Sequence, residues 1–247
     1  MRTKIFCDIA DLDLIKKFNK KKIVSGFTTN PSLMKQAGVR DYKKFCLDVL
    51  NITKNKPVSF EIFSDDLDEM YEQAMEIAAW GNSILVKIPI TNSKGKKTTG
   101  VIKKLLNQNV KCNVTAILTI EQVKEIFEIS KNETKVIISI FAGRIADTGI
   151  NPIPMMSEAV KICKDKKNIE ILWASTRELL NIFQANEIGC QVITVPHDIL
   201  KKVSLIGKNL NDLSLETVQM FLKDAVKAGF KIDINRWTLN LYLLLVE

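Results

Sequence analysis

The sequence predicts an α/β protein, a single (β/α)8 TIM barrel with an additional C-terminal helix and an apolar tail. Short runs rich in isoleucine and valine alternate eight times with longer amphipathic segments, which is typical of parallel strands covered by helices. The chain has 247 residues, and such a barrel needs about 250. No stretch rich in glycine or proline marks a linker, so we expect one domain.

The expected strands are residues 4–9, 23–27, 57–62, 83–88, 110–115, 135–140, 169–174 and 190–194. Eight βα units close naturally into a barrel, whereas an open doubly wound sheet usually stops at about five or six strands. Segments between the strands, such as residues 66–80 and 120–130, carry apolar residues at helical spacing. Thr119 is expected to cap the second of these helices, and Gly81 and Gly189 stand where helices should end.

The end of the chain departs from the βα pattern. Residues 213–229 are expected to form one further helix, which completes a domain over residues 1–230. Residues 231–247 form a tail, and its segment 237–246 is strongly apolar but too short to cross a membrane as a helix. We expect this segment to be buried on a partner subunit or on the outside of the barrel, and the protein to be a homo-oligomer. An artefact of the reading frame is the remaining alternative.

Composition argues against several other classes of protein. The five cysteines are scattered without a Cys-x-x-Cys pair, so we expect buried thiols and no disulfide or metal site. The only histidine, His197, is expected at the start of a helix.

No signal peptide or membrane span is present, which predicts a cytosolic protein. The net charge of +8 favours anionic partners, but the lysine runs lack interleaved aromatic residues, so neither nucleic acid nor a membrane is expected as a partner.

Polar side chains stand near the C-terminal ends of seven expected strands. Active sites of barrel enzymes lie at this end of the strands. The polar residues are Asp8, the segment Thr28-Thr29-Asn30-Pro31-Ser32, Glu61, Lys87, Asn113 with Thr115, Ser139 with Arg144, and Ser175 with Arg177. The eighth strand offers no comparably good polar candidate.

Lys87 is the most informative of these residues, because it interrupts an apolar strand. Burial disfavours the charged form of an amine, and a neutral lysine can attack a carbonyl to form a Schiff base. The alternative is a lysine held in an ion pair with Glu61 or Asp8. Taken by itself, Lys87 supports the two interpretations about equally.

Asp8 and Glu61 could move the protons that Schiff-base chemistry requires. Thr115 shares a strand face with Asn113 and could hold a water molecule for Glu61 to activate. Either carboxylate could instead be structural, as a helix cap or an ion-pair partner. The convergence of two carboxylates with a lysine on neighbouring strands favours the functional interpretation.

Arg144 and Arg177 are expected to begin or enter the helices after the sixth and seventh strands. Guanidinium groups and helix N-termini can both hold a phosphate group. Each residue could separately be an ordinary surface arginine. Their matched positions on neighbouring units, where barrels often bind phosphate, favour a phosphate site.

Five segments of the chain resemble the transaldolase family, and especially its short branch, which also contains fructose-6-phosphate aldolase. They occur in the family's order, and the resemblance covers roughly residues 1 to 230. The segments are Phe27-Thr28-Thr29-Asn30-Pro31-Ser32, Val86-Lys87-Ile88-Pro89, Cys112-Asn113-Val114-Thr115-Ala116-Ile117, Ile138-Ser139-Ile140-Phe141-Ala142-Gly143-Arg144-Ile145-Ala146-Asp147 and Ala174-Ser175-Thr176-Arg177.

The resemblance implies metal-independent class I aldol chemistry of the pentose phosphate pathway type, without a cofactor, and with Lys87 as the Schiff-base lysine. It further implies that Asp8 is the acid and base of C–C cleavage, and that Glu61 and Thr115 activate the catalytic water. The substrate-binding residues that it implies are Thr28, Asn30, Asn113, Ser139, Phe141, Arg144, Ser175 and Arg177, with the two arginines on phosphate. The donor would be fructose 6-phosphate or sedoheptulose 7-phosphate, and the acceptor erythrose 4-phosphate or glyceraldehyde 3-phosphate.

Two positions separate a transaldolase from the aldolase branch of this family. In the aldolase, a glutamine is expected at the place of Glu61 and a tyrosine at the place of Phe141, so both residues favour the transferase. A dihydroxyacetone aldolase similar to fructose-6-phosphate aldolase is the alternative. A third hypothesis is a catalytically silent barrel that binds an anionic ligand or nucleic acid. The segment Lys94-Gly95-Lys96-Lys97 and the apolar tail depart from the family pattern. These departures leave open which acceptor sugar is preferred and how the oligomer is built.

Overall fold

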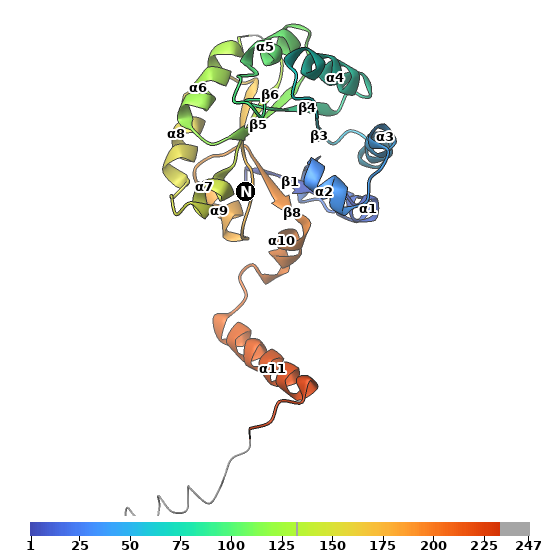
Figure 1. Cartoon of the computed structure of the whole chain (residues 1–247). Helices are drawn as coiled ribbons and strands as arrows, with labels where there is room; N and C mark the ends of the chain where they lie inside the picture. The colour runs from blue at the N-terminus through green and yellow to red at the C-terminus, as the bar shows by residue number, and fades with distance from the viewer. Residues whose placement is uncertain (132, 233–247) are drawn as a thin grey trace, which may run out of the picture. The chain divides into compact units, whose positions relative to one another are not determined.

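The structure, a computed structural model, describes residues 1–131 and 133–232. Eight parallel strands pair in chain order and close on themselves, because β8 pairs with β1. Helices surround these strands (Figure 1). The predicted (β/α)8 barrel is therefore confirmed. The strands are β1 Lys4–Asp8, β2 Val24–Thr28, β3 Val58–Glu61, β4 Ile84–Pro89, β5 Cys112–Ile117, β6 Val136–Ile140, β7 Ile169–Trp173 and β8 Val192–Pro196.

Several helices of the described residues begin at a residue whose side chain caps them. Asp11, Asp41 and Asp66 each accept backbone N–H groups at helix starts, and Thr119 forms the predicted cap as part of a capping box with Gln122. The helices are α1 Leu12–Asn19, α2 Pro31–Gln36, α3 Tyr42–Thr53, α4 Leu67–Ala79, α5 Thr99–Asn107, α6 Ile120–Ile129, α7 Ala142–Asp147, α8 Ile153–Cys163, α9 Leu180–Glu187, α10 His197–Lys201 and α11 Leu210–Ala228. His197 begins α10, as predicted.

Strands β5 and β8 begin two residues later than predicted, at residues 112 and 192 instead of 110 and 190. The reason is that the N–H groups of Val110 and Cys190 close the preceding helices, where they donate to the carbonyls of Leu105 and Ala185. A backbone N–H that ends a helix in this way does not start a strand ladder. Gly189 has the expected positive φ of 74°, whereas Gly81, just after α4, is not left-handed.

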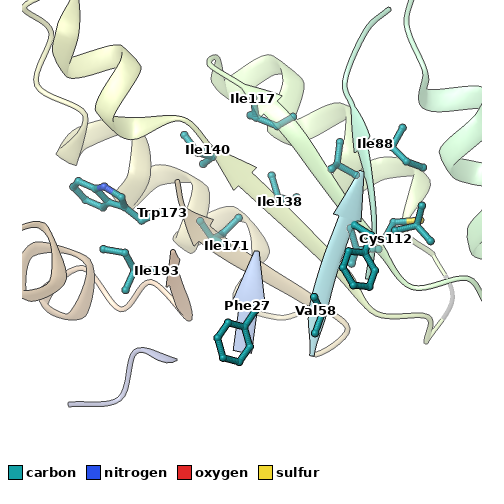
Figure 2. Packing of buried hydrophobic residues seen from close by; sticks show 14 of the residues in the cluster. Phe27, Val58, Ile88, Cys112, Ile117, Ile138, Ile140, Ile171, Trp173 and Ile193 are labelled. Atoms are coloured by element: carbon teal, nitrogen blue, oxygen red, sulfur yellow. The ribbon is translucent and has the colours of Figure 1, made fainter. Parts of the chain in front are cut away.

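The strands alternate between residues that face the helices and residues that face the barrel interior. Figure 2 shows buried residues at alternate positions, such as Ile138 and Ile140 on β6. The inward-facing residues form a separate buried cluster of Phe6, Leu85, Ile137, Leu172, Ala174 and Val192. Gly26 makes room for this cluster, because a Cβ atom there would lie 2.7 Å from the Phe6 ring. On four of these strands the inward position two residues further along is polar: Asp8, Lys87, Ser139 and Thr194.

The five cysteines are all buried, as expected, and each is a free thiol in the structure. Burial raises the pKa of four of these thiols, those of Cys7, Cys46, Cys112 and Cys190, to about 12. They are therefore protonated and unreactive at neutral pH. Within the described residues, no group of three or more histidine, cysteine or acidic side chains is arranged to hold a metal ion.

The chain forms two compact units, Met1–Val203 and a second unit that begins at Ser204. The second unit contains α11, the predicted additional helix, which starts at residue 210 and not at 213 because the Asn209 side chain caps it. The helix α11 ends at Ala228, and Gly229, which has a φ of 70°, caps its C-terminus. Most of the predicted tail over 231–247 lies outside the described residues, which end at 232. No helix in the described part of the chain is long and apolar enough to cross a membrane.

Candidate active site

A cavity of about 450 Å3 lies at the C-terminal ends of the strands, and every residue predicted for the site lines it. These residues are Asp8, Thr28, Asn30, Glu61, Lys87, Asn113, Thr115, Ser139, Phe141, Arg144, Ser175 and Arg177. The cavity is also lined by residues that the prediction did not include, namely Pro31, Ser32, Leu33, Ala174, Thr176, Thr194 and Pro196. Thr194 could have been found from its position two residues after the inward-facing Val192.

Lys87 lies beside Glu61 because the two residues are cross-strand partners on β4 and β3. The Nζ atom of Lys87 is 3.0 Å from Oε2 of Glu61, and it donates to the backbone carbonyl of Thr29 at 3.1 Å. Lys87 is only 8% exposed. The ion pair with Glu61 is thus present, and it is compatible with a nucleophilic amine, since a carboxylate at this distance can accept the amine's proton.

Asp8 is the second carboxyl group in the cavity, at the end of β1. Its Oδ1 atom accepts a hydrogen bond of 2.7 Å from the hydroxyl of Thr28. Burial raises the pKa of the Asp8 carboxyl, although the positive charge of Lys87 and the bond from Thr28 partly oppose this effect. Asp8 therefore holds a proton more readily than an exposed aspartate, which suits a group that must both donate and accept one.

Replacing Asp8 with asparagine is expected to stabilise the protein at neutral pH. Between pH 3.8, the ordinary aspartate pKa, and the raised pKa of the folded state, Asp8 holds a proton that the unfolded chain releases, so the free energy of unfolding falls as pH rises through this range. We expect Asp8→Asn to have a higher Tm than wild type at pH 7, with the gap in Tm narrowing as pH falls toward 3.8. Thermal unfolding at several pH values measures this. A gap in Tm that does not change with pH would contradict a raised pKa for Asp8. The control is Asp13→Asn, which changes an exposed side chain of α1.

A hydrogen-bonded series of side chains crosses the cavity from β3 to β6. The Nδ2 atom of Asn113 donates to the hydroxyl of Ser59 at 2.9 Å, and the hydroxyl of Ser139 donates to Oδ1 of Asn113 at 2.6 Å. These bonds fix the orientation of the Asn113 amide. The buried hydroxyl of Thr115 has no hydrogen-bond partner among the described residues. A buried polar atom of this kind is suited to a water molecule or a substrate group.

Asn30 combines a place in the cavity with a structural role. Its side-chain oxygen accepts the N–H of Leu33 and so caps α2, which begins with Pro31. The cap holds the segment after β2 against the cavity. The side chain therefore has a fixed position before any substrate binds.

Arg144 and Arg177 lie on the same cavity, but their local structures differ. Arg144 is in α7, as predicted, and its guanidinium group lies 5.6 Å from the centre of the Phe141 ring. Arg177 was expected at a helix start and instead lies in the loop before α9. The reason is that the side chain of Asn181 accepts the N–H groups of Arg177 and Glu178, and the helix begins only at Leu180.

Gly143 and Ser175 bring the two arginine segments together. A Cβ atom on Gly143 would lie 1.6 Å from the backbone oxygen of Ser175, so only glycine permits this approach. Ser175 itself has a φ of 62°, in the left-handed region. Arg177 is also paired with Asp147 at the end of α7, with its Nε 3.0 Å from Oδ1. The guanidinium groups are thereby held at one side of the cavity.

The fold and the cavity define a parallel (β/α)8 barrel whose open end holds a buried lysine beside a carboxylate. Solved structures with similar folds include a mandelate oxidase mutant, with a TM-score of 0.55 and 12% identity over 78% of this chain and 65% of that chain. A putative lyase/mutase from Burkholderia cenocepacia has a TM-score of 0.58 and 11% identity over 97% of this chain and 90% of that one. At these identities the likeness shows the fold alone.

Comparison of sequences is more specific. Residues 5–241 match the model of the family Transaldolase/Fructose-6-phosphate aldolase. A probable transaldolase of Thermoanaerobacter sp. (strain X514) is 32% identical over 230 residues, which cover 93% of this chain and 100% of that protein. A probable transaldolase of Brucella ovis is 34% identical over 231 residues, 93% of this chain and 99% of that protein. This chain therefore belongs to the transaldolase/fructose-6-phosphate aldolase family, which confirms the resemblance seen in its motifs and supports an aldol-transferring enzyme.

Proposed function

We propose that this protein is a transaldolase, which transfers a dihydroxyacetone unit between sugar phosphates through a Schiff base on Lys87. The observation that carries the proposal is the nearly buried amine of Lys87, 3.0 Å from the carboxylate of Glu61 in a cavity at the open end of the barrel. An amine in this position can attack a ketone, and the carboxylate can take up and return the protons.

Formation of the Schiff base joins Lys87 Nζ to the carbonyl carbon C2 of the donor ketose and expels the carbonyl oxygen as water. Glu61 accepts the proton that the amine loses and returns one to the departing oxygen. Asp8 then removes the proton of the C4 hydroxyl, the C3–C4 bond breaks, and the aldose product leaves. The electron pair of that bond remains on the three-carbon unit as an enamine on Lys87.

Transfer reverses these steps on a second sugar. The enamine carbon attacks the aldehyde of the acceptor, Asp8 returns its proton to the new hydroxyl, and water releases the new ketose from Lys87. The unpartnered hydroxyl of Thr115 is available to hold that water for Glu61. The Asn113 amide, fixed by Ser59 and Ser139, is placed to bind hydroxyl groups of the three-carbon unit.

The phosphate groups of donor and acceptor would bind at Arg144 and Arg177. Two guanidinium groups on one side of the cavity match the charge and the geometry of a phosphate. We propose fructose 6-phosphate or sedoheptulose 7-phosphate as donor, and erythrose 4-phosphate or glyceraldehyde 3-phosphate as acceptor, as in a pentose phosphate pathway transaldolase. No metal ion or cofactor takes part in the proposed reaction.

A coupled assay tests the proposed reaction. Fructose 6-phosphate is supplied with and without erythrose 4-phosphate, and release of glyceraldehyde 3-phosphate is followed. We expect continuous turnover only when the acceptor is present, with sedoheptulose 7-phosphate as the second product. Turnover without an acceptor would show the dihydroxyacetone aldolase instead. An absence of turnover in both mixtures would favour the catalytically silent barrel.

Arg177→Ala is expected to raise the KM for phosphorylated sugars by roughly ten- to a hundredfold, the effect of losing a hydrogen-bonded ion pair. Steady-state kinetics with fructose 6-phosphate measures this change. The yield of the borohydride-trapped Schiff base of unphosphorylated dihydroxyacetone on Lys87 should be nearly unaffected, and an equal loss with that compound would contradict a phosphate role. Arg40→Ala, an exposed arginine that does not line the cavity, is the matched control.

A further inference from the structure

Thr194 adds a polar side chain to the cavity from β8, the one strand for which the sequence offered no good candidate. The residue is 6% exposed, and its hydroxyl oxygen lies 2.5 Å from the hydroxyl oxygen of Thr28. The Thr28 hydroxyl in turn lies 2.7 Å from Oδ1 of Asp8. Three side chains from β8, β2 and β1 thus form a continuous hydrogen-bonded series that ends on Asp8.

The number of protons in this series fixes the direction of its bonds. A hydroxyl group has one proton to donate, and an ionised carboxylate can only accept. When Asp8 is ionised, the Thr28 hydroxyl must donate its hydrogen bond to Asp8. In the short contact between the two threonines, Thr194 must then be the donor and Thr28 the acceptor. When Asp8 is protonated, it can donate to Thr28, and Thr28 can donate to Thr194. Rotation of O–H bonds alone therefore adapts the series to either state of Asp8.

The backbone of Thr194 is held in place from the neighbouring loop. The hydroxyl of Thr176 donates to the carbonyl oxygen of Thr194 at 2.7 Å, which ties β8 to the segment after β7. Thr176 is itself buried. The Thr194 hydroxyl is therefore presented to Thr28 from a fixed backbone, as a group that positions another residue must be.

We propose that Thr194 is a positioning residue for Asp8, which acts through the hydroxyl of Thr28 to orient the carboxyl group and to support its ionised form. This inference rests on the proposed function, because it takes Asp8 as the acid and base of C–C cleavage. The charged groups that face Asp8 are Lys87 from β4, which favours its ionised form, and Glu61 from β3, which disfavours it. Thr194 is uncharged and acts on Asp8 only through hydrogen bonds. It stands on β8, which pairs with β1, the strand that carries Asp8.

Thr194→Val removes the hydroxyl group and nearly preserves the shape of the side chain. Without the donor, Thr28 becomes a weaker and less oriented donor to Asp8. We expect kcat to fall about five- to tenfold, the typical effect of one hydrogen bond, while KM stays within about twofold. The acidic limb of the kcat–pH profile should move to higher pH, because ionised Asp8 loses support. Thr194→Ser should restore both the rate and the profile.

Controls separate this role from packing and from failure of the proposed function. Thr53→Val removes a buried hydroxyl of α3 that has no hydrogen-bond partner among the described residues, and it should leave the kinetics unchanged. If wild-type protein has no transfer activity, the proposed function fails. If wild type is active and Thr194→Val keeps its kcat and pH profile, only this inference is overturned. A loss that Thr194→Ser does not restore, or a rise in KM without a shifted profile, would also overturn it. Thr194→Ala, measured in the same way, replaces Thr194→Val if that variant does not fold.

Discussion

Replacing Lys87 with methionine is expected to lower kcat by at least about 10⁴-fold, because removal of the nucleophile in covalent catalysis abolishes the reaction path. No other lysine among the described residues lines the cavity. Neighbouring amines therefore cannot replace the lost one. The assay with fructose 6-phosphate and erythrose 4-phosphate measures the loss directly.

The same change has a cost for stability that must be separated from the loss of chemistry. Lys87→Met leaves Glu61, whose side chain is 17% exposed, without its positive partner. Breaking a buried ion pair in this way costs roughly 3–5 kcal/mol, whereas replacing both partners by neutral groups is often close to neutral. The double variant Lys87→Met with Glu61→Gln should therefore regain most of the lost Tm and remain inactive.

The control for Lys87→Met is the same change at a lysine outside the cavity. Lys111→Met removes an exposed lysine that precedes β5 and lines no part of this cavity. It should keep wild-type kinetics. Transfer activity in the folded double variant at a rate close to that of wild type would exclude Lys87 as the nucleophile.

Glu61→Gln is expected to lower the rate of transfer by about 10²–10³-fold, the usual contribution of a general acid or base. The variant keeps the shape of the side chain and a hydrogen-bonding partner for Lys87, but it cannot take a proton from the amine or from water. Compared with wild type, a larger share of the three-carbon units cleaved from the donor should be released as free dihydroxyacetone, and a smaller share transferred to an acceptor. Product analysis with and without erythrose 4-phosphate measures this ratio.

The matched control for Glu61 is another lysine-paired carboxylate. Glu170 on β7 lies 2.7 Å from the ammonium groups of both Lys4 and Lys135, and it does not line the active-site cavity. Glu170→Gln should leave the ratio of products unchanged, even if it lowers Tm. A transfer rate in Glu61→Gln equal to that of wild type would contradict the role of Glu61 as the proton-transferring base.

The barrel and most of the cavity lining could be predicted from the sequence because both depend on short-range periodicity. The apolar runs mark the strands, and polar residues at strand ends must meet at one end of a parallel barrel. The partner of Lys87 could not be predicted, since Asp8 and Glu61 were both available. The pairing of β3 with β4 decides it, because Glu61 and Lys87 are opposite each other in that register.

Thr194 and Arg177 were misjudged because the ends of their elements differ from those that the hydrophobic pattern predicts. The expected eighth strand ended at residue 194, which gave Thr194 no distinct place. The strand β8 in fact runs from Val192 to Pro196, and Thr194 lies two residues after Val192, on the same inward face. The Asn181 side chain holds Arg177 outside α9. Such bonds depend on contacts that hydrophobic patterns do not encode.

The central claim is that Lys87 forms a covalent intermediate with the donor sugar. Its most direct test is reduction with borohydride in the presence of fructose 6-phosphate, followed by peptide mass spectrometry. We expect a reduced adduct of the dihydroxyacetone unit on Lys87 in wild type and in Glu61→Gln, and none on this peptide in Lys87→Met. A wild-type protein that turns over fructose 6-phosphate but carries no adduct on Lys87, or carries it on a different lysine, would contradict the Schiff base on Lys87.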